Sequence, residues 1–82
     1  MLQKGSVVVS TKGHDKGRLF VVACIEGDFA WLIDGTYRKW ENLKKKRIKH
    51  IQLAKQNFEG NVETAKDFEV ATFLKNLGKL HK

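Results

Sequence analysis

The sequence predicts a mainly β domain, a small curled barrel of about five strands, followed by one amphipathic helix. Three observations predict it. Short β-branched and aromatic runs separated by glycine-bearing turns fill the first half of the chain. The chain has no proline, so closure of the sheet would protect strand edges that nothing else guards. Beyond Gly60 the apolar residues recur about every 3.6 residues, as in a helix, instead of every two residues, as in a strand.

The first three predicted strands follow one another closely. Ser6–Ser10 is a β-branched run, and a polar loop from Thr11 to Gly17 follows it. Leu19–Ile25 is apolar on both alternating faces, which favours a strand covered on both sides. Glu26–Asp28 is a tight turn signal because its glycine tolerates positive φ. Phe29–Ile33 then returns as the partner strand.

The remaining elements are a cationic stretch, one more strand and the helix. Thr36–Arg47 is too basic to lie in a core, and Ile48–Leu53 interleaves polar and apolar residues like a strand. We expect the helix near 62–77, with Asn61 or Thr64 as its cap and Gly78 as its C′ residue. Its apolar face has helical spacing and consists of Val70, Phe73, Leu74 and Leu77.

These elements divide the chain into three parts. Residues 1–54 form the predicted barrel, 55–61 a linker, and 62–82 the C-terminal helix and tail. The apolar helix face must be buried either on the barrel or on a partner chain, and both remain open. Trp31 shares one alternating face with Phe29 and Ile33, so we assign it to the core or to packing against the helix.

The charge of +7 is concentrated in one place. Arg38–His50 holds seven of the 16 basic residues and one acidic residue, Glu41. The single cysteine, Cys24, cannot form an internal disulfide, and no apolar run is long enough for a membrane span or a secretory signal. We therefore expect a soluble cytoplasmic protein without membrane contact, and the charge favours nucleic acid or another polyanion as partner.

No pattern in the sequence predicts catalysis. The loop Gly13–Arg18 lacks the glycine spacing of a phosphate-binding loop and precedes a strand, whereas such a loop must open a helix. The three histidines are scattered and have no cysteine partners, which argues against a metal site. We expect no enzyme activity, no catalytic residues, no metal and no cofactor.

Several motifs in order resemble the KOW motif of ribosomal proteins and transcription-elongation factors. They are Val7-Val8-Val9, Gly13-x-Asp15-x-Gly17-Arg18 and Leu32-Ile33-Asp34-Gly35. The continuation, Arg38-Lys39 and then Lys49-His50-Ile51, is similar to the archaeal and eukaryotic family of large-subunit ribosomal protein fourteen and to small bacterial RNA-binding relatives. The resemblance covers residues 5 to 53. It implies an SH3-like barrel that binds RNA, with a structural turn at Gly13, Asp15 and Gly17.

The cationic segment is the predicted RNA-binding site. Many cations in a short segment repel one another, and phosphates that neutralise them release counterions and add affinity. A solvated, flexible loop is the alternative. Tyr37 and Trp40 could stack on unpaired bases, although Trp40 could equally fold back over the barrel as a lid. The expected RNA-binding residues are Lys12, Lys16, Arg18, Tyr37, Arg38, Lys39, Trp40, Lys44, Lys45, Lys46, Arg47, Lys49 and His50.

The expected function is non-catalytic RNA binding, with ribosomal RNA or the ribosome as the partner that the resemblance implies. Two alternatives stay open. A protein-interaction adaptor would use the SH3-like barrel and would dock a protein partner through the C-terminal helix. A nucleic-acid-binding module of the transcription-elongation type would share the same electrostatics.

Overall fold

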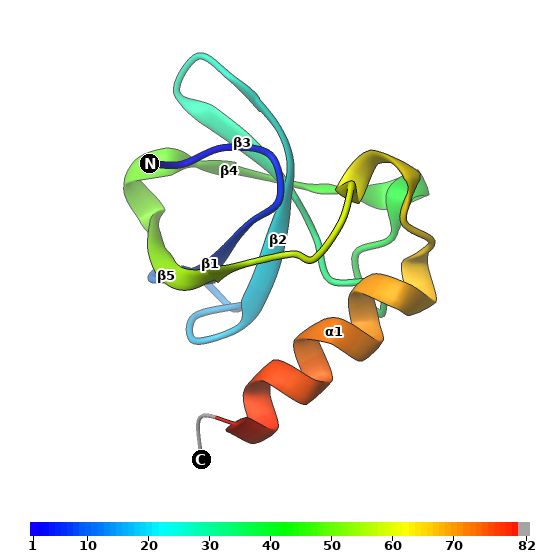
Figure 1. The fold of residues 1–82 in the computed structure, drawn as a ribbon. Coiled ribbons are helices and arrows are strands. Elements are labelled where there is room, and N and C mark those ends of the chain that lie inside the picture. Colours follow the sequence, from blue (N-terminus) through cyan, green and yellow to red (C-terminus); the bar gives the residue numbers. More distant parts are fainter. Residues whose placement is uncertain (81–82) are drawn as a thin grey trace.

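Within residues 1–80, which the computed structural model describes, five antiparallel strands form one sheet and a single α-helix follows them (Figure 1). The predicted mainly β class with a C-terminal helix is thereby confirmed. The expected tail at 81–82 lies outside the described residues. The elements are β1 (Ser6–Ser10), β2 (Leu19–Glu26), β3 (Phe29–Ile33), β4 (Lys44–Arg47), β5 (Ile51–Asn57) and α1 (Asp67–Leu80).

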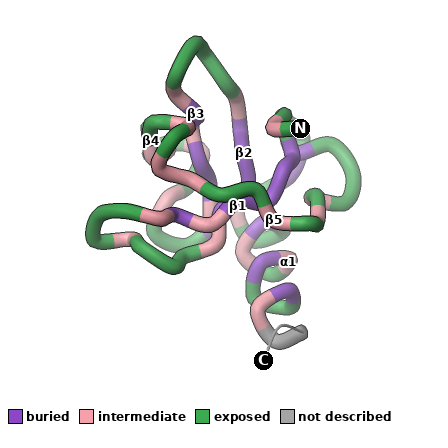
Figure 2. The backbone as a smooth tube through the Cα atoms, turned by 90° about the vertical axis from the view of Figure 1, so that its left-hand side faces the viewer, coloured by how far each residue is buried: buried purple, intermediate pink, exposed green. Residues whose placement is uncertain are grey.

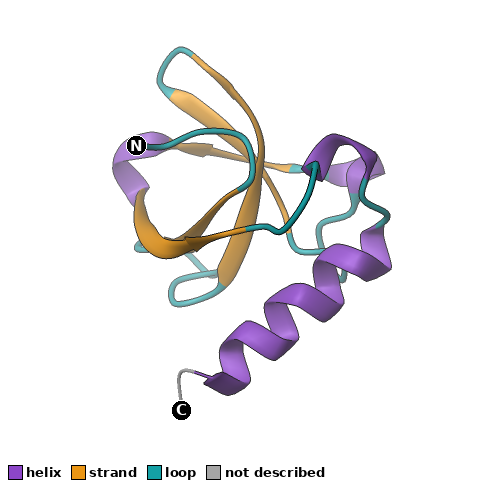
Figure 3. Cartoon of the chain, viewed as in Figure 1, coloured by secondary structure: helices purple, strands orange, loops and turns teal. Residues whose placement is uncertain are grey.

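The sheet curls because its two edge strands are consecutive in the chain. The strand order is β4-β3-β2-β1-β5, so β4 and β5 lie at opposite edges. Only the short 3-10 helix η2 (Ile48–His50) joins them (Figure 3). Four residue steps from Arg47 to Ile51 span at most about 14 Å, so the edges must approach each other. This curl is compatible with the SH3-like barrel that the resemblance implies.

Strand β2 is covered on both faces from Phe20 to Ala23, as its sequence predicts, whereas Ile25 near its end is exposed. One apolar cluster fills the inside of the curl and consists of Val8, Phe20, Val22, Ala30 and Leu32. A second cluster lies between the sheet and the C-terminal segment and includes Val7, Val21, Ile33, Val62, Val70, Leu74 and Leu77. Figure 2 shows the buried positions running along β1 and β2 and along one side of α1.

The helix therefore packs on the sheet of its own chain, which answers the question that the sequence left open. Gly35 is buried at this contact with φ +78°, and a Cβ at this position would lie 2.6 Å from the amide nitrogen of Ala71. Trp40 closes the contact, because its Nε1 donates to the carbonyl of Ala65 (2.8 Å) and its amide to Oδ1 of Asp67 (2.9 Å). The described α-helix is too short and too polar to cross a membrane.

Several predicted boundaries are wrong. The cationic run 44–47 forms strand β4 rather than a loop, because pairing with β3 satisfies its backbone on one side. Ile48–His50 is a 3-10 turn, and the strand expected there runs instead from Ile51 to Asn57, into the expected linker 55–61. The predicted helix start at residue 62 is a separate 3-10 helix, η3 (Val62–Thr64).

The ends of the helix also differ from the prediction. The side chain of Asn61 caps η3 by accepting from the amide of Glu63, and α1 begins only at Asp67. Oε1 of Glu69 accepts from the amide of Lys66 (3.0 Å), which satisfies one donor at the helix start. Gly78 lies inside α1 and does not end it, because the helix continues to Leu80.

Trp31 is not a core residue, in contrast to the prediction. It is half-buried on the outer face of β3 and belongs to neither apolar cluster. Although Ile33 on the same face is covered by the C-terminal segment, Trp31 lies opposite Lys45 of β4. The helix covers only one end of this outer face, so alternation alone could not predict which aromatic residue is buried.

Candidate nucleic-acid interface

Strand β4 divides the cationic run between two faces of the sheet. Lys44 and Lys46 pair with Leu32 and Ala30, and Lys45 pairs with Trp31. Because side chains alternate along a strand, the first two cations point toward the inside of the curl. Lys45 and Arg47 point to the outer face, beside Trp31 and Phe29. The cationic segment that the sequence predicts as one site is therefore divided into two separate sets of cations.

Lys46 is held within the protein rather than offered to a ligand. Its Nζ donates to Oδ1 of Asp15 (2.6 Å) and to the carbonyl of Lys12 (2.6 Å), and its side chain is only 9% exposed. Asp15 also accepts from the hydroxyl of Ser10 (2.7 Å). Lys46 is among the expected RNA-binding residues, and in the structure its ammonium group has a structural role between the loop and β4.

The environment of Asp15 favours its charged form. Burial raises the pKa of the Asp15 carboxyl, but the hydrogen bonds from Lys46 and Ser10 and the nearby charge of Lys44 outweigh burial. The pKa of Asp15 consequently lies below its ordinary value. The resemblance implies a structural role for Asp15 in the turn, and in the structure its carboxylate ties the loop to β4.

A cleft of about 420 Å³ opens between the loop after β1 and the segment before β4. Its walls carry the cations Arg18, Arg38 and Lys44, and also His14 and Tyr37. The guanidinium of Arg18 lies 4.5 Å from the centre of the Tyr37 ring, and Tyr37 is 69% exposed. The cleft therefore combines positive charge with an exposed aromatic ring.

Asp34 shapes the segment that presents Tyr37. Its Oδ1 accepts from the amides of Thr36 (2.9 Å) and Arg38 (2.7 Å), so it fixes the turn after β3. The two acidic residues on the cleft, Asp15 and Asp34, are both engaged in hydrogen bonds within the protein. In the sequence the Asp34-Gly35 pair directly after a strand indicates a turn, but it does not reveal which amides the Asp34 carboxylate accepts from.

The outer face of β3 and β4 carries a second aromatic and cationic set. Nζ of Lys45 lies 4.4 Å from the ring centre of Phe29 and 5.4 Å from that of Trp31. The guanidinium of Arg47 lies 5.1 Å from the Phe29 ring. These cation–π contacts hold two exposed cations in place above the sheet. Only the pairing of β3 with β4 reveals them, because the residues lie far apart in the sequence.

The turn η2 adds a further positive region. Burial and the charges of Lys12, Lys49, Lys46 and Arg47 together lower the pKa of His50 below its ordinary value. The backbone carbonyl of His50 accepts from the amide of Thr11 (2.9 Å), which joins η2 to the start of the loop after β1. The segments around residues 12 and 47–50 therefore share one electropositive neighbourhood.

The other expected binding residues are distributed as follows. Lys12, Lys16, Lys39 and Lys49 are exposed. Trp40 packs against the sheet–helix cluster and donates a hydrogen bond to Ala65, which is the arrangement that the lid interpretation predicts. Gly13 and Gly17 adopt φ +90° and +89°, as a tight turn requires.

Most of these cations lack an acidic partner. Within residues 1–80 the ion pairs are Lys46–Asp15 and the exposed pair Lys4–Glu63. Of the seven basic residues between Arg38 and Lys49, Lys46 alone is neutralised by a carboxylate in the described chain. The described residues also bring together no group of three His, Cys, Asp or Glu side chains suited to a metal ion.

Comparison with models of known protein families and with curated proteins finds no match for this chain.

Proposed function

We propose that this protein is a non-catalytic RNA-binding protein that binds structured RNA through its phosphate backbone. The observation that carries this proposal is the set of cations around β4 that have no carboxylate partner in the described chain. Lys44 and Arg38 lie on the cleft side, and Lys45 and Arg47 lie on the outer face. The mutual repulsion of these cations is unfavourable by itself. Bound phosphates compensate it, and the counterions condensed on the RNA are released into solution.

The depressed pKa of His50 supports this view of the electrostatics. Burial is the largest cause of the lowered pKa, and four neighbouring cations lower it further by repelling the protonated imidazole. A polyanion bound nearby would relieve that repulsion. The exposed ring of Tyr37, stacked with Arg18, adds a surface on which an unpaired base could lie.

Ribosomal RNA, or a site on the ribosome, is the target we propose on the sequence resemblance, and a cytoplasmic location goes with it. Double-helical RNA is bound mostly by shape and backbone contacts, so modest sequence specificity is expected. Since the described residues divide the cations between two faces, the RNA would contact β4 from both sides rather than along one strip.

The test is the salt dependence of binding to a structured ribosomal RNA fragment. Two double variants remove one face each, R38A/K44A for the cleft and K45A/R47A for the outer face. Each should flatten the slope of log affinity against log salt by about one to two, since each phosphate contact contributes about 0.7–0.9. The matched control K55A/K66A removes two exposed lysines elsewhere and should leave the slope unchanged.

If neither double variant changes the slope beyond the control, the proposed interface is wrong. Competition with DNA of equal length separates an RNA-binding protein from a module of the transcription-elongation type. Preference for RNA supports the proposal, whereas equal or stronger competition by DNA contradicts it.

A further inference from the structure

An aromatic groove lies beside the helix, away from the cations of β4. Phe58 and Phe73 form its floor, with ring centres 5.1 Å apart in an edge-to-face arrangement. Phe68 stands at its side and is 65% exposed, although it belongs to the helix that packs on the sheet. An exposed aromatic ring next to two half-buried ones makes a contiguous apolar surface rather than a single stray residue.

The groove continues along the helix toward the end of β5. Two adjoining hollows, of about 330 and 500 Å³, share the lining residues Glu59, Phe73 and Asn76. Phe68 does not belong to the apolar core and lines this groove instead. Val70, Leu74 and Leu77 are buried on the sheet and complete the other side of the helix.

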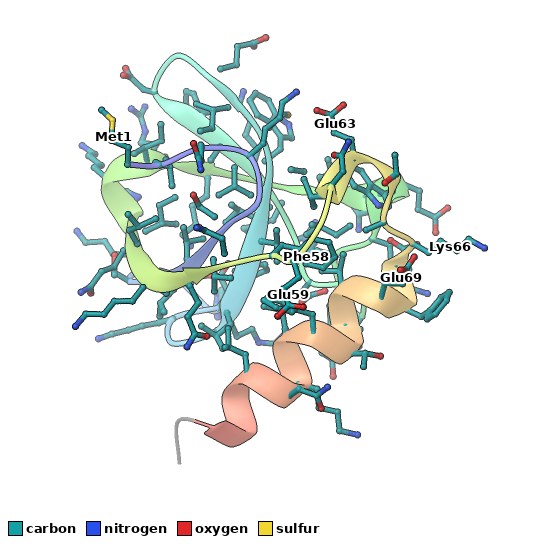
Figure 4. All side chains as sticks on the ribbon, in the orientation of Figure 1. Met1, Phe58, Glu59, Glu63, Lys66 and Glu69 are labelled. Carbon is teal, nitrogen blue, oxygen red and sulfur yellow. The ribbon has the colours of Figure 1, made fainter. Side chains whose placement is uncertain are left out.

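The charge on this groove is opposite to that of the rest of the protein. Its ionisable lining residues are Glu59 and Glu69, and no lysine or arginine of the described chain lines either hollow. Figure 4 shows Phe58, Glu59 and Glu69 on the same side, where the segment after β5 passes the first turns of α1. In a chain of net charge +7, an aromatic groove whose ionisable lining residues are all acidic has a distinct electrostatic preference.

We propose that this groove binds a segment of another protein that carries apolar side chains flanked by lysine or arginine. The apolar side chain would lie on Phe58 and Phe73 beside Phe68, and the flanking cations would meet Glu59 and Glu69. Charge complementarity selects this occupant, since the groove repels acidic segments and nucleic acid alike. The proposal goes beyond RNA binding and does not depend on it.

The test uses two short synthetic peptides with the same leucines and phenylalanines, one with flanking lysines and one with flanking glutamates. Each is titrated into the ¹⁵N-labelled full chain, and amide chemical shifts are followed. We expect the lysine peptide to shift amides of 56–59 and 68–76 and to bind about tenfold more tightly than the glutamate peptide. The overall positive charge of the chain disfavours binding of the lysine peptide. Tighter binding of that peptide would therefore be a stringent test of the acidic groove.

Two variants separate apolar from charged contacts. F68S should weaken the binding of both peptides. L53S is its control, since Leu53 is another exposed apolar residue but lies on β5. E59Q/E69Q should abolish the preference for lysine, while the amide oxygen introduced at position 69 can still accept the hydrogen bond from the Lys66 backbone amide. RNA affinity should be unchanged in F68S, so this proposal and RNA binding can fail separately.

Three outcomes would overturn the proposal. The peptides could bind equally, or shift amides only outside the groove, or leave all amides unchanged. Groove amides that shift with protein concentration alone, together with dimers in sedimentation, would assign the groove to a second copy of the chain instead.

Discussion

Nζ of Lys46 lies 2.6 Å from Oδ1 of Asp15, a residue 31 positions earlier in the chain. Both side chains are largely buried, at 9% and 16% exposure, so the pair fastens the loop after β1 to the edge strand β4. Lys46 therefore stabilises the fold, although it lies in the middle of a basic run. Its removal tests stability rather than binding.

D15N should lower the free energy of unfolding by about 1–3 kcal/mol, because it leaves the largely buried Lys46 ammonium without its counterion. Urea denaturation measures the effect. E63Q is the matched control, since the Lys4–Glu63 pair has the same N···O contact type but is more than half exposed at both ends. Exposed pairs contribute little, so equal effects of the two variants would contradict the structural role of Asp15.

The acid stability of the protein should depend on Asp15. Its pKa is lowered on folding, so its contribution is fully present above the unfolded pKa, near 3.8, and is lost as the pH falls toward the folded value. The difference in unfolding free energy between wild type and D15N should be constant near neutrality and should narrow below about pH 4. Urea titrations at several pH values test this, and a constant difference at all pH values would refute it.

Gly35 should be the least replaceable glycine of the chain for docking the helix. G35A should destabilise the protein by about 2–4 kcal/mol, because its Cβ would collide with the backbone of Asp67 and Ala71. G60A is the control, since Gly60 has φ +88° but open space around it. Both substitutions share the left-handed backbone cost, so the excess for G35A measures the collision with the helix.

The N–H signal of the Trp40 indole reports the same event, because its hydrogen bond to Ala65 forms only when the C-terminal segment is docked. G35A should shift this signal and G60A should not. Equal unfolding free energies and unchanged indole signals for both variants would show that the helix does not depend on Gly35.

Tyr37 should matter for RNA with unpaired bases and not for stability. Y37A should weaken binding to a hairpin with an open loop by about 1–3 kcal/mol, the range found for base–aromatic stacking. It should affect a fully paired duplex much less, and Y37F should bind like wild type because the ring remains. Fluorescence anisotropy with the two RNAs measures the difference. Equal losses on both RNAs would assign Tyr37 to positioning Arg18 instead.

Much of the fold was predictable from local patterns. The continuous apolar run Leu19–Ile25 indicated a strand covered on both faces, and two apolar clusters do cover its first part. Strand β4 was not predictable in this way, since four consecutive cations carry no apolar alternation. Pairing with β3 along one edge stabilises it, and charged edge strands also resist pairing with other chains.

The candidate site was predictable in composition but not in arrangement. The basic residues and Trp40 lie in the expected segment, but their partners come from distant segments. Lys46 pairs with Asp15, and Lys45 contacts the rings of Phe29 and Trp31. Trp40 donates a hydrogen bond to Ala65. No spacing rule within the run could reveal these contacts.

The sequence by itself determined the first three strands, the turns at glycine, the amphipathic helix and the excess of positive charge, because these follow from local conformational preferences and residue chemistry. Only the tertiary structure decided which cations are neutralised, which aromatic rings are covered and where the helix docks. Those outcomes depend on strand register and on contacts between residues about 25 to 35 positions apart, which the curl of the sheet and the docking of the C-terminal segment bring together.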